Sequence, residues 1–244
     1  MPESKVILGD CMEVMKGYPD KYFDLAIVDP PYGINQPNMT MGSNPNRKSE
    51  TRNGIKKIIS HGGVSTAERL KGRLNSGSGK LKNRLLNTSK INWDNNTPPL
   101  EYFDQLFRIS KNQIIWGGNY FNLPPTRGIG CWDKKQPWDN FSTWEMIWTS
   151  FDCPAFIIRH SNRGGNNVDA KIHPTQKDVY LYRKLISKFA KEGDKILDTH
   201  LGSGSSRIAS DKAGFDFTGI EIDHDYFNAA EKRFNDYKKQ LKLF

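Results

Sequence analysis

The sequence predicts an α/β protein with an open, mostly parallel sheet and helices on both of its faces. Short apolar runs, as at residues 5–8, 24–28 and 195–198, alternate with segments of helical periodicity, which is the pattern of strands joined by crossover helices. A glycine-rich turn at residues 201–204 directly follows one of these runs. With 244 residues, 36% of them hydrophobic and 11% aromatic, the chain is long enough to bury one large core. We therefore expect a single domain over residues 1–244.

The predicted elements of the first half alternate between strands and helices. In order, they are a strand within 5–10, a short helix within 11–19, a strand at 24–29, a helix within 98–111 and a strand within 112–121 that runs into a Gly-Gly turn. The helix within 98–111 has an apolar stripe at helical spacing, formed by Leu100, Phe103, Leu106 and Phe107. This stripe is predicted to face the sheet.

The second half continues the alternation. Residues 131–160 hold Trp132, Trp138, Trp144 and Trp148 and are predicted as strands near an edge of the sheet. Packing is the favoured role of these rings, although one of them, or Phe141, remains a candidate wall of a ligand pocket.

The last third is predicted to hold three helices and two strands. Thr175 is expected to be the N-cap of a helix, with Asp178 three residues on. A strand, the glycine-rich turn, a helix and a strand follow over 195–223. The final helix is amphipathic, and its apolar face is predicted to hold Phe227, Ala230, Phe234 and Tyr237.

The basic charge of the chain is concentrated in residues 35–92, which we name the basic arm. This segment contains twelve Lys or Arg against two Glu, lacks Phe, Trp and Tyr, and is rich in Gly, Ser and Asn. Such a composition cannot bury much apolar surface and is expected to be mobile when free. It is either a solvated insertion or an arm that orders on a nucleic-acid backbone. In the second case the DNA-binding residues are Arg47, Lys48, Arg52, Lys56, Lys57, Arg69, Lys71, Arg73, Lys80, Lys82 and Arg84.

Cysteine and histidine spacing predicts neither a disulfide framework nor a metal site. The three cysteines are far apart without a CxxC pair, and the five histidines show no ligand spacing, which favours a reducing, cytoplasmic location. No apolar run approaches the ~20 residues of a membrane helix, and the first residues lack a signal-peptide core. We therefore expect no metal and no membrane partner.

The glycine-rich turn predicts a cofactor site. The stretch DTHLGSGSS at residues 198–206 follows a predicted strand and opens a helix, as in nucleotide-type cofactor loops. Arg207 stands where a dinucleotide loop has its third glycine, and no Walker lysine is present. Asp198 would repel a pyrophosphate but suits an ammonium group, and Glu221 is placed for ribose hydroxyls. S-Adenosylmethionine has an ammonium, a ribose and no phosphate, so it fits best; a simple packing turn is the alternative.

A second loop, Asp29-Pro30-Pro31-Tyr32, follows the strand at 24–29. Parallel strands present their carboxyl ends at one edge, so this loop should face the glycine-rich turn. The exocyclic amine of a nucleobase is a poor nucleophile until its two hydrogens are accepted in hydrogen bonds. Asp29 offers a carboxylate, Pro30 offers a carbonyl that Pro31 restrains, and Tyr32 offers a face for a flipped base. The alternative is a strand-ending turn with a structural tyrosine.

As a set, these motifs resemble the amino-type DNA methyltransferases that use S-adenosylmethionine. DPPY at 29–32 resembles their catalytic motif and DTHLGSGSS at 198–206 their cofactor loop. HPTQK at 173–177 is similar to the segment that precedes this loop in the circularly permuted β class. GDC at 9–11 and GIEID at 219–223 resemble the elements that meet the adenine and ribose of the cofactor. The resemblance covers the chain outside the basic arm and implies a Rossmann-like fold.

The resemblance also assigns roles to individual residues. It implies catalytic roles for Asp29, Pro30, Pro31 and Tyr32. It implies cofactor contacts for Asp10, Cys11, Thr175, Lys177, Asp198, Thr199, Leu201, Gly202, Ser203, Gly204, Ser205, Glu221 and Ile222. For Lys177, a phosphate contact or a solvated surface position stays open.

The chain departs from the family pattern in two places. Asp178 stands where the family usually has proline, and residues 161–172 are too few for a large target-recognition domain. The basic arm is the candidate replacement for that domain.

The resemblance implies a site-specific DNA methyltransferase acting on the N6 amine of adenine, because aspartate at the first catalytic position usually accompanies adenine. N4-cytosine methylation stays open. A nucleic-acid-binding protein on a degenerate methyltransferase fold is a more distant alternative, and Arg207 disfavours a nicotinamide oxidoreductase. A role in restriction–modification and a homodimer are further expectations from the resemblance.

Overall fold

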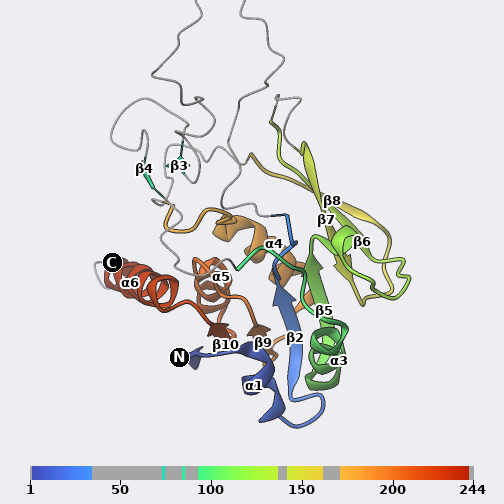
Figure 1. Ribbon diagram of the computed structural model, residues 1–244, viewed down its shortest axis with the longest axis horizontal. Helices are drawn as coiled ribbons and strands as arrows, with labels where there is room; N and C mark the ends of the chain where they lie inside the picture. The colour runs from blue at the N-terminus through green and yellow to red at the C-terminus, as the bar shows by residue number, and fades with distance from the viewer. Residues whose placement is uncertain are drawn as a thin grey trace, which may run out of the picture.

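The computed structural model describes residues 2–34, 73–74, 84–85, 93–136, 142–161 and 171–241. The strands of its main sheet are β1 Ser4–Leu8, β2 Phe23–Val28, β5 Ser110–Trp116, β6 Ile129–Asp133, β7 Trp144–Thr149, β8 Phe156–Arg159, β9 Lys195–Asp198 and β10 Asp216–Glu221. Within these described ranges they form one eight-stranded sheet in the order β1-β10-β9-β2-β5-β7-β6-β8 (Figure 1).

Neighbouring strands are parallel except at β7, which runs antiparallel to both β5 and β6. The predicted mostly parallel sheet is therefore confirmed. The start of β7 lies beside the end of β5, where the Gly117 amide donates a hydrogen bond to the carbonyl of Met146 at 2.8 Å. An antiparallel strand thus brings its first residues to the edge where the parallel strands end.

Helices cover both faces of the sheet, as predicted (Figure 1). They are α1 Cys11–Lys16, α3 Leu100–Ile109, α4 Val179–Phe189, α5 Ser205–Ala213 and α6 His224–Leu241. In β2, Leu25 and Ile27 join the core cluster that includes residues of α4, α5 and α6, whereas Ala26 and Val28 join the cluster of α1 and α3. A strand buried on both faces reads as a continuous apolar run.

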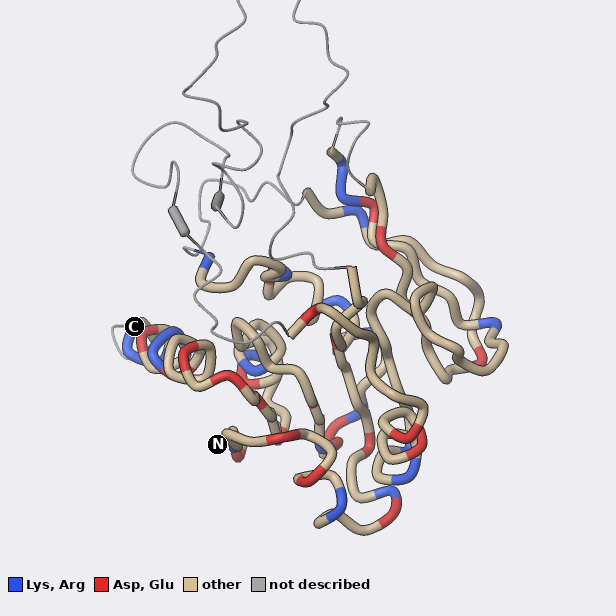
Figure 2. Tube along the Cα trace, viewed as in Figure 1, with Lys and Arg blue, Asp and Glu red and all other residues tan. Residues whose placement is uncertain are grey.

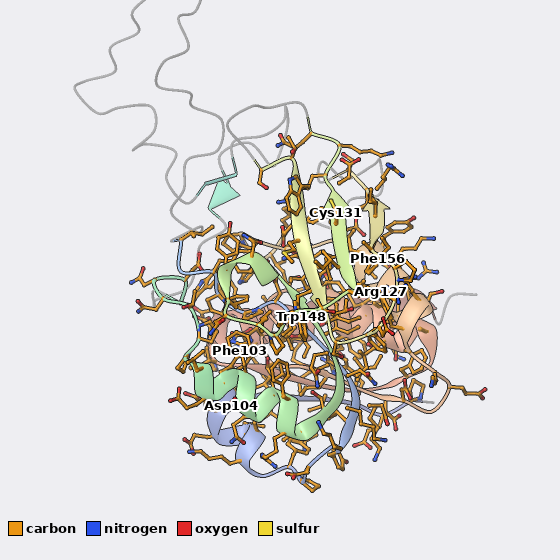
Figure 3. All side chains as sticks on the ribbon, turned by 90° about the vertical axis from the view of Figure 1, so that its right-hand side faces the viewer. Phe103, Asp104, Arg127, Cys131, Trp148 and Phe156 are labelled. Carbon is orange, nitrogen blue, oxygen red and sulfur yellow. The ribbon has the colours of Figure 1, made fainter. Side chains whose placement is uncertain are left out.

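Helix α3 buries a stripe that shares Phe103 and Leu106 with the predicted one. Leu100 is 60% exposed, so its assignment to the stripe is wrong; the buried residues are Tyr102, Phe103, Leu106 and Ile109. Figure 3 shows Phe103 on this helix and Trp148 on β7, both members of the same core cluster, with the exposed Asp104 beside them. Leu100 is the first residue of the helix, and the buried stripe begins only at Tyr102.

Helix α4 begins at Val179, so the prediction of Thr175 as its N-cap is wrong. The cap is Asp178, whose carboxylate accepts a hydrogen bond from the Tyr180 amide at 2.7 Å. This explains the departure at Asp178, because aspartate caps a helix through its side chain. Residues 173–176 instead form a turn, closed by a bond from the Gln176 amide to the His173 carbonyl.

Helix α6 buries Tyr226, together with the predicted Ala230, Phe234 and Tyr237, while the predicted Phe227 is only half-buried.

Arg207, the residue that replaces a third glycine, connects α5 to its neighbours. Its guanidinium donates to Ser4 Oγ at 2.9 Å, pairs with Glu231, and lies 3.8 Å from the ring centre of Phe234.

The tryptophans of the sheet edge divide into packing and surface residues. Trp132 and Trp148 are buried, as expected for packing, and Trp144 is half exposed. Trp138 and Phe141 lie outside the described residues.

Of the basic arm, the structure describes only β3 Arg73–Leu74 and β4 Arg84–Leu85, an antiparallel pair. The expected mobility of the arm and its predicted DNA-binding side chains lie outside the described residues. Elsewhere, acidic and basic residues are interspersed (Figure 2). Across the described ranges, no helix has the length and apolar character needed to span a membrane.

Candidate active site

The predicted loops meet at one cavity beyond the carboxyl ends of β1, β2, β9 and β10. Its volume is about 380 Å³, within the range of about 300–1,000 Å³ that small-molecule sites occupy. The lining comes from residues 9–12, from Asp29 and Pro31 of the loop 29–32, which is predicted to be catalytic and is called the catalytic loop, from His173 and residues 175–177, from the glycine-rich loop 199–203, and from Trp93 and residues 96–99 after the basic arm. Segments far apart in the sequence therefore share one site.

The glycine-rich loop has the backbone shape that its glycines predict. Gly202 and Gly204 have φ of +51° and +70°, a region that residues with a side chain rarely adopt. The Gly202 amide donates to Glu221 Oε2 at 2.7 Å, and the Asp223 amide donates to Glu221 Oε1 at 2.9 Å. Burial raises the pKa of Glu221, and these amides oppose the shift. Glu221 thus fixes the loop and still lines the cavity.

Asp198, at the end of β9, is 1% exposed. Its oxygens accept hydrogen bonds from Ser206 Oγ at 2.5 Å and from the His200 amide at 3.0 Å. Burial raises its pKa to about 7. Asp198 does not line the cavity described above; it supports the loop from behind, and its predicted contact with an ammonium group stays a prediction.

Most of the residues expected to meet the cofactor line this cavity. They are Asp10, Cys11, Thr175, Lys177, Thr199, Leu201, Gly202, Ser203, Glu221 and Ile222. Asp198, Gly204 and Ser205 lie outside the lining. Asp10 also caps α1, because its Oδ1 accepts a hydrogen bond from the Met12 amide at 2.7 Å. The pKa of Cys11 is raised to about 12 by burial, so this cysteine is a neutral thiol.

The glycine-rich loop is tied to residues 173–177 and to α6. Ser205 Oγ donates to the Lys177 carbonyl at 2.7 Å. Arg233, from α6, donates to the Ser203 carbonyl at 2.7 Å and to Ser205 Oγ at 2.9 Å. These hydrogen bonds hold the end of the loop and the first residue of α5 in place.

Asp29 leaves β2 with both carboxylate oxygens engaged. Oδ1 accepts a hydrogen bond from the Tyr32 hydroxyl at 2.7 Å, and Oδ2 accepts one from Lys177 Nζ at 2.6 Å. Each carboxylate oxygen has two acceptor positions, so acceptor capacity remains for a ligand in the cavity. Burial raises the pKa of Asp29, Lys177 lowers it, and Glu145 raises it further.

Lys177 is buried at 5% side-chain exposure, so the alternative of a solvated surface lysine is wrong. Its ammonium pairs with Asp29 and with Glu145 Oε1 at 2.8 Å, and it lies 4.9 Å from the ring centre of Trp116. Burial disfavours the charged lysine, but the two carboxylates raise its pKa above the ordinary value. Two anions therefore share one buried cation.

The ring of Tyr32 is packed on the protein itself. It stacks on Tyr120 with ring centres 4.7 Å apart and planes 11° apart. A side chain on Gly117 would come within 2.3 Å of the ring, so only glycine fits there. The predicted stacking of a flipped base on Tyr32 stays a prediction; the face against Tyr120 is covered.

Asp94 holds the catalytic loop at the point where the basic arm leaves and returns. Its Oδ1 accepts hydrogen bonds from the amides of Tyr32 at 2.7 Å and of Gly33 at 3.0 Å. Asp94 is 3% exposed. One buried carboxylate therefore holds together the residues that flank the arm on its two sides.

We expect Asp94→Ala to loosen this loop. Removing the acceptor leaves two backbone amides to find new partners, so the free energy of unfolding should fall by about 2–3 kcal/mol. Denaturant unfolding measures this, with Asp94→Asn, which keeps one acceptor oxygen, as the milder control. Equal stability of Asp94→Ala and the parent protein would contradict the role given to Asp94.

Comparison with known sequences decides the family. A sequence model of the DNA methylase family matches residues 111–232, half of the chain. The chain belongs to the DNA methylase family. Its curated relatives include the type II methyltransferases M2.LlaDCHI of Lactococcus lactis subsp. cremoris, 26% identical over 152 residues, and M2.DpnII of Streptococcus pneumoniae, 43% identical over 150 residues. Each of these alignments covers 62% of this chain and 51% of the relative. This family member therefore spans about half the length of those two relatives.

A third relative, the type II methyltransferase M2.MboI of Moraxella bovis, is 24% identical over 260 residues, covering 96% of this chain and 88% of the relative. Two solved structures share the fold of this chain. They are an M1.HpyAVI–SAM complex (TM-score 0.51, 18% identity, 94% and 99% coverage) and the cytosine-N4-specific PvuII DNA methyltransferase (TM-score 0.53, 13% identity, 95% and 86% coverage). These likenesses confirm the Rossmann-like methyltransferase architecture.

Three residues of the site were missed from the sequence. Glu145, at the start of β7, and Tyr120, in the short helix Gly118–Tyr120, contact Tyr32 of the catalytic loop. Asp94 accepts hydrogen bonds from two backbone amides of the segment 32–33. None belongs to a recognisable motif. The one available signal was the Gly-Gly turn after β5. Such a turn indicates that another chain segment approaches closely, but it does not indicate which segment.

Proposed function

We propose that this chain is a DNA methyltransferase that transfers a methyl group from S-adenosylmethionine to the N6 amine of adenine. The observation that carries the proposal is the position of Asp29, which has free acceptor capacity and lines the same cavity as the glycine-rich loop. A hydrogen-bond acceptor for the base and a nucleoside-type cofactor loop therefore lie side by side. Family membership and the type II methyltransferase relatives support the proposal.

The residues present fit S-adenosylmethionine. The left-handed Gly202 allows backbone close to a ligand, Glu221 offers a carboxylate at the end of β10, and Asp10 offers another at the end of β1. When bound, S-adenosylmethionine supplies a methyl group on a positively charged sulfur. Asp10 and Glu221 would hold its adenosine part. The structural neighbour crystallised with this cofactor is in agreement.

The catalytic loop would act by orientation and by accepting hydrogen bonds. Asp29 and the Pro30 carbonyl would accept the two hydrogens of the base amine, which localises the nitrogen lone pair. The buried position of the loop would exclude water and fix the amine in line with the methyl group, an arrangement that accounts for much of the catalysis of group transfer. No covalent intermediate with the protein is needed.

The basic arm is proposed to bind the DNA backbone and to carry part of the sequence recognition. Its charge fits a polyanion, and Asp94 places both of its ends at the catalytic loop. A homodimer, expected from the resemblance to the family, stays a prediction.

The test is transfer of a labelled methyl group to DNA, followed by digestion and nucleoside analysis. We expect the label in N6-methyladenine. Label in N4-methylcytosine would show that the target base is cytosine and not adenine. Binding of S-adenosylmethionine without transfer to any single- or double-stranded DNA would refute the proposed activity and favour a nucleic-acid-binding protein on a methyltransferase fold.

A further inference from the structure

Two side chains outside the catalytic loop converge on it from β7 and from the turn before α4. Glu145 and Lys177 are 12% and 5% exposed in their side chains, and their charged groups lie 2.8 Å apart. Glu145 Oε1 also lies 2.7 Å from the Tyr32 hydroxyl, and its Oε2 lies 3.0 Å from Lys134 Nζ. Glu145 thus has three donor groups around it, whereas Asp29 has two.

The Tyr32 hydroxyl lies 2.7 Å from both Asp29 Oδ1 and Glu145 Oε1. One hydroxyl has one hydrogen to donate, so it cannot satisfy both carboxylates at once. The two carboxylates therefore compete for the one hydroxyl hydrogen, whereas the Lys177 ammonium has three N–H groups and pairs with both of them. When Glu145 accepts the Tyr32 hydroxyl hydrogen, Asp29 Oδ1 loses that hydrogen bond, and Glu145 also shares the positive charge of Lys177 with Asp29.

We propose that Glu145 is a positioning residue for catalysis: it holds Lys177 and the Tyr32 hydroxyl and thereby sets how strongly Asp29 accepts hydrogen bonds from the substrate amine. Lys177 is its partner in this role. Without Lys177, a buried Asp29 would take up a proton and lose acceptor strength. Without the charge of Glu145, Lys177 would bind Asp29 alone and occupy it. The inference rests on the proposed methyl transfer.

The charges around Asp29 support a balance of this kind. Glu145 remains an anion, since Lys177 and Lys134 overcome its burial and lower its pKa to about 2. Asp198 is a further carboxylate that interacts with Asp29 through space, and Tyr102 and Tyr182 are buried nearby with raised pKa values, hence neutral. His173, near Lys177, is neutral because burial lowers its pKa to about 3. Lys177 contacts Asp29 directly, and Glu145 shares Lys177 and the Tyr32 hydroxyl with it. These are thus the two charges that set the pKa of Asp29.

The proposal predicts opposite shifts in the pH dependence of kcat for two variants. Activity needs ionised Asp29, so kcat should rise with pH through the pKa of that group. Glu145→Gln keeps the shape of the side chain and removes a charge that raises the pKa of Asp29. The rise of kcat with pH should therefore move to lower pH. Lys177→Met removes the charge that lowers the pKa of Asp29, so the rise of kcat should move to higher pH. Lys177→Arg, which keeps the charge, should move the rise part of the way back. We expect kcat of Glu145→Gln on its plateau to fall about tenfold, because about 1.4 kcal/mol of weakened hydrogen bonding in the transition state corresponds to a factor of ten in rate.

The control is Glu13→Gln, the same substitution in a surface pair with Lys16, where Glu13 is 71% exposed; its profile should match that of the parent. The second measurement needs no activity: carbonyl ¹³C NMR titration of Asp29, assigned by its loss in Asp29→Asn, should show the same two opposite shifts. Identical titration of Asp29 in the parent and Glu145→Gln proteins would overturn the proposal, as would shifts in one direction for both variants. Absence of methyl transfer by the parent protein would instead overturn the proposed function, and the NMR titration would still decide the role of Glu145.

Discussion

Asp29→Ala should lower kcat for methyl transfer by about a hundred- to a thousandfold, the loss that follows removal of one preorganised hydrogen-bonding group from an active site. The carboxylate is the side-chain acceptor of the catalytic loop that lines the cavity. Without it, one hydrogen of the base amine has no partner and the nitrogen lone pair stays delocalised. The rate is measured with saturating DNA and S-adenosylmethionine in single turnover.

The fold should survive this substitution, because Lys177 keeps Glu145 as a counter-charge at 2.8 Å. Calorimetry should show unchanged binding of S-adenosylmethionine, whose predicted contacts lie on the glycine-rich loop. Asp29→Asn, which keeps one carbonyl acceptor, should lose less activity than Asp29→Ala. Near-parental turnover by Asp29→Ala would refute the role of Asp29, whereas loss of cofactor binding would show that the substitution damages the site more widely.

Neutralising the basic arm should weaken DNA binding strongly and leave cofactor binding intact. We suggest a variant in which six of its charges, Lys56, Lys57, Arg69, Lys71, Lys80 and Lys82, are replaced by Gln. If each contacts a phosphate, the slope of log K against log salt should become shallower by about five, because each contact contributes about 0.9. Fluorescence anisotropy with a DNA duplex at several salt concentrations measures the slope.

A matched control replaces six exposed lysines outside the arm, Lys5, Lys16, Lys184, Lys188, Lys191 and Lys212, by Gln. This variant should keep the parental salt dependence. An unchanged slope in the arm variant would exclude the arm as the DNA clamp. Because Asp94 joins the two ends of the arm, a variant in which a short glycine linker replaces residues 35–92 is also feasible and should bind S-adenosylmethionine normally.

Much of the site could be predicted because its motifs are local. A strand followed by DPPY, or by a turn with glycines at positive φ, encodes both an element and its ending within about ten residues. In a mostly parallel sheet such endings share one edge, so Asp29, Gly202 and Glu221 were expected together, and they line one cavity. The order of the motifs along the chain also indicated the family.

The helix boundaries were less predictable. Thr175 and Asp178 are both good N-caps, and sequence alone cannot choose between them. The structure begins α4 after Asp178 because residues 173–177 cross the cavity and bring Lys177 to Asp29. Likewise, Leu100 has the spacing of a core residue but is the first residue of α3, and the buried stripe begins only at Tyr102.

The sequence by itself determined the α/β class, the two loops and their common edge, since periodicity and turn chemistry are properties of neighbouring residues. Only the tertiary structure decided that Glu145, Lys177 and Asp94 surround the catalytic loop. Glu145 reaches it because β7 is antiparallel and starts where β5 ends. Asp94 reaches it although the basic arm, residues 35–92, separates the two along the chain. The physical reason is that burial makes opposite charges and unpaired amides find partners in space, and those partners are not adjacent in the chain.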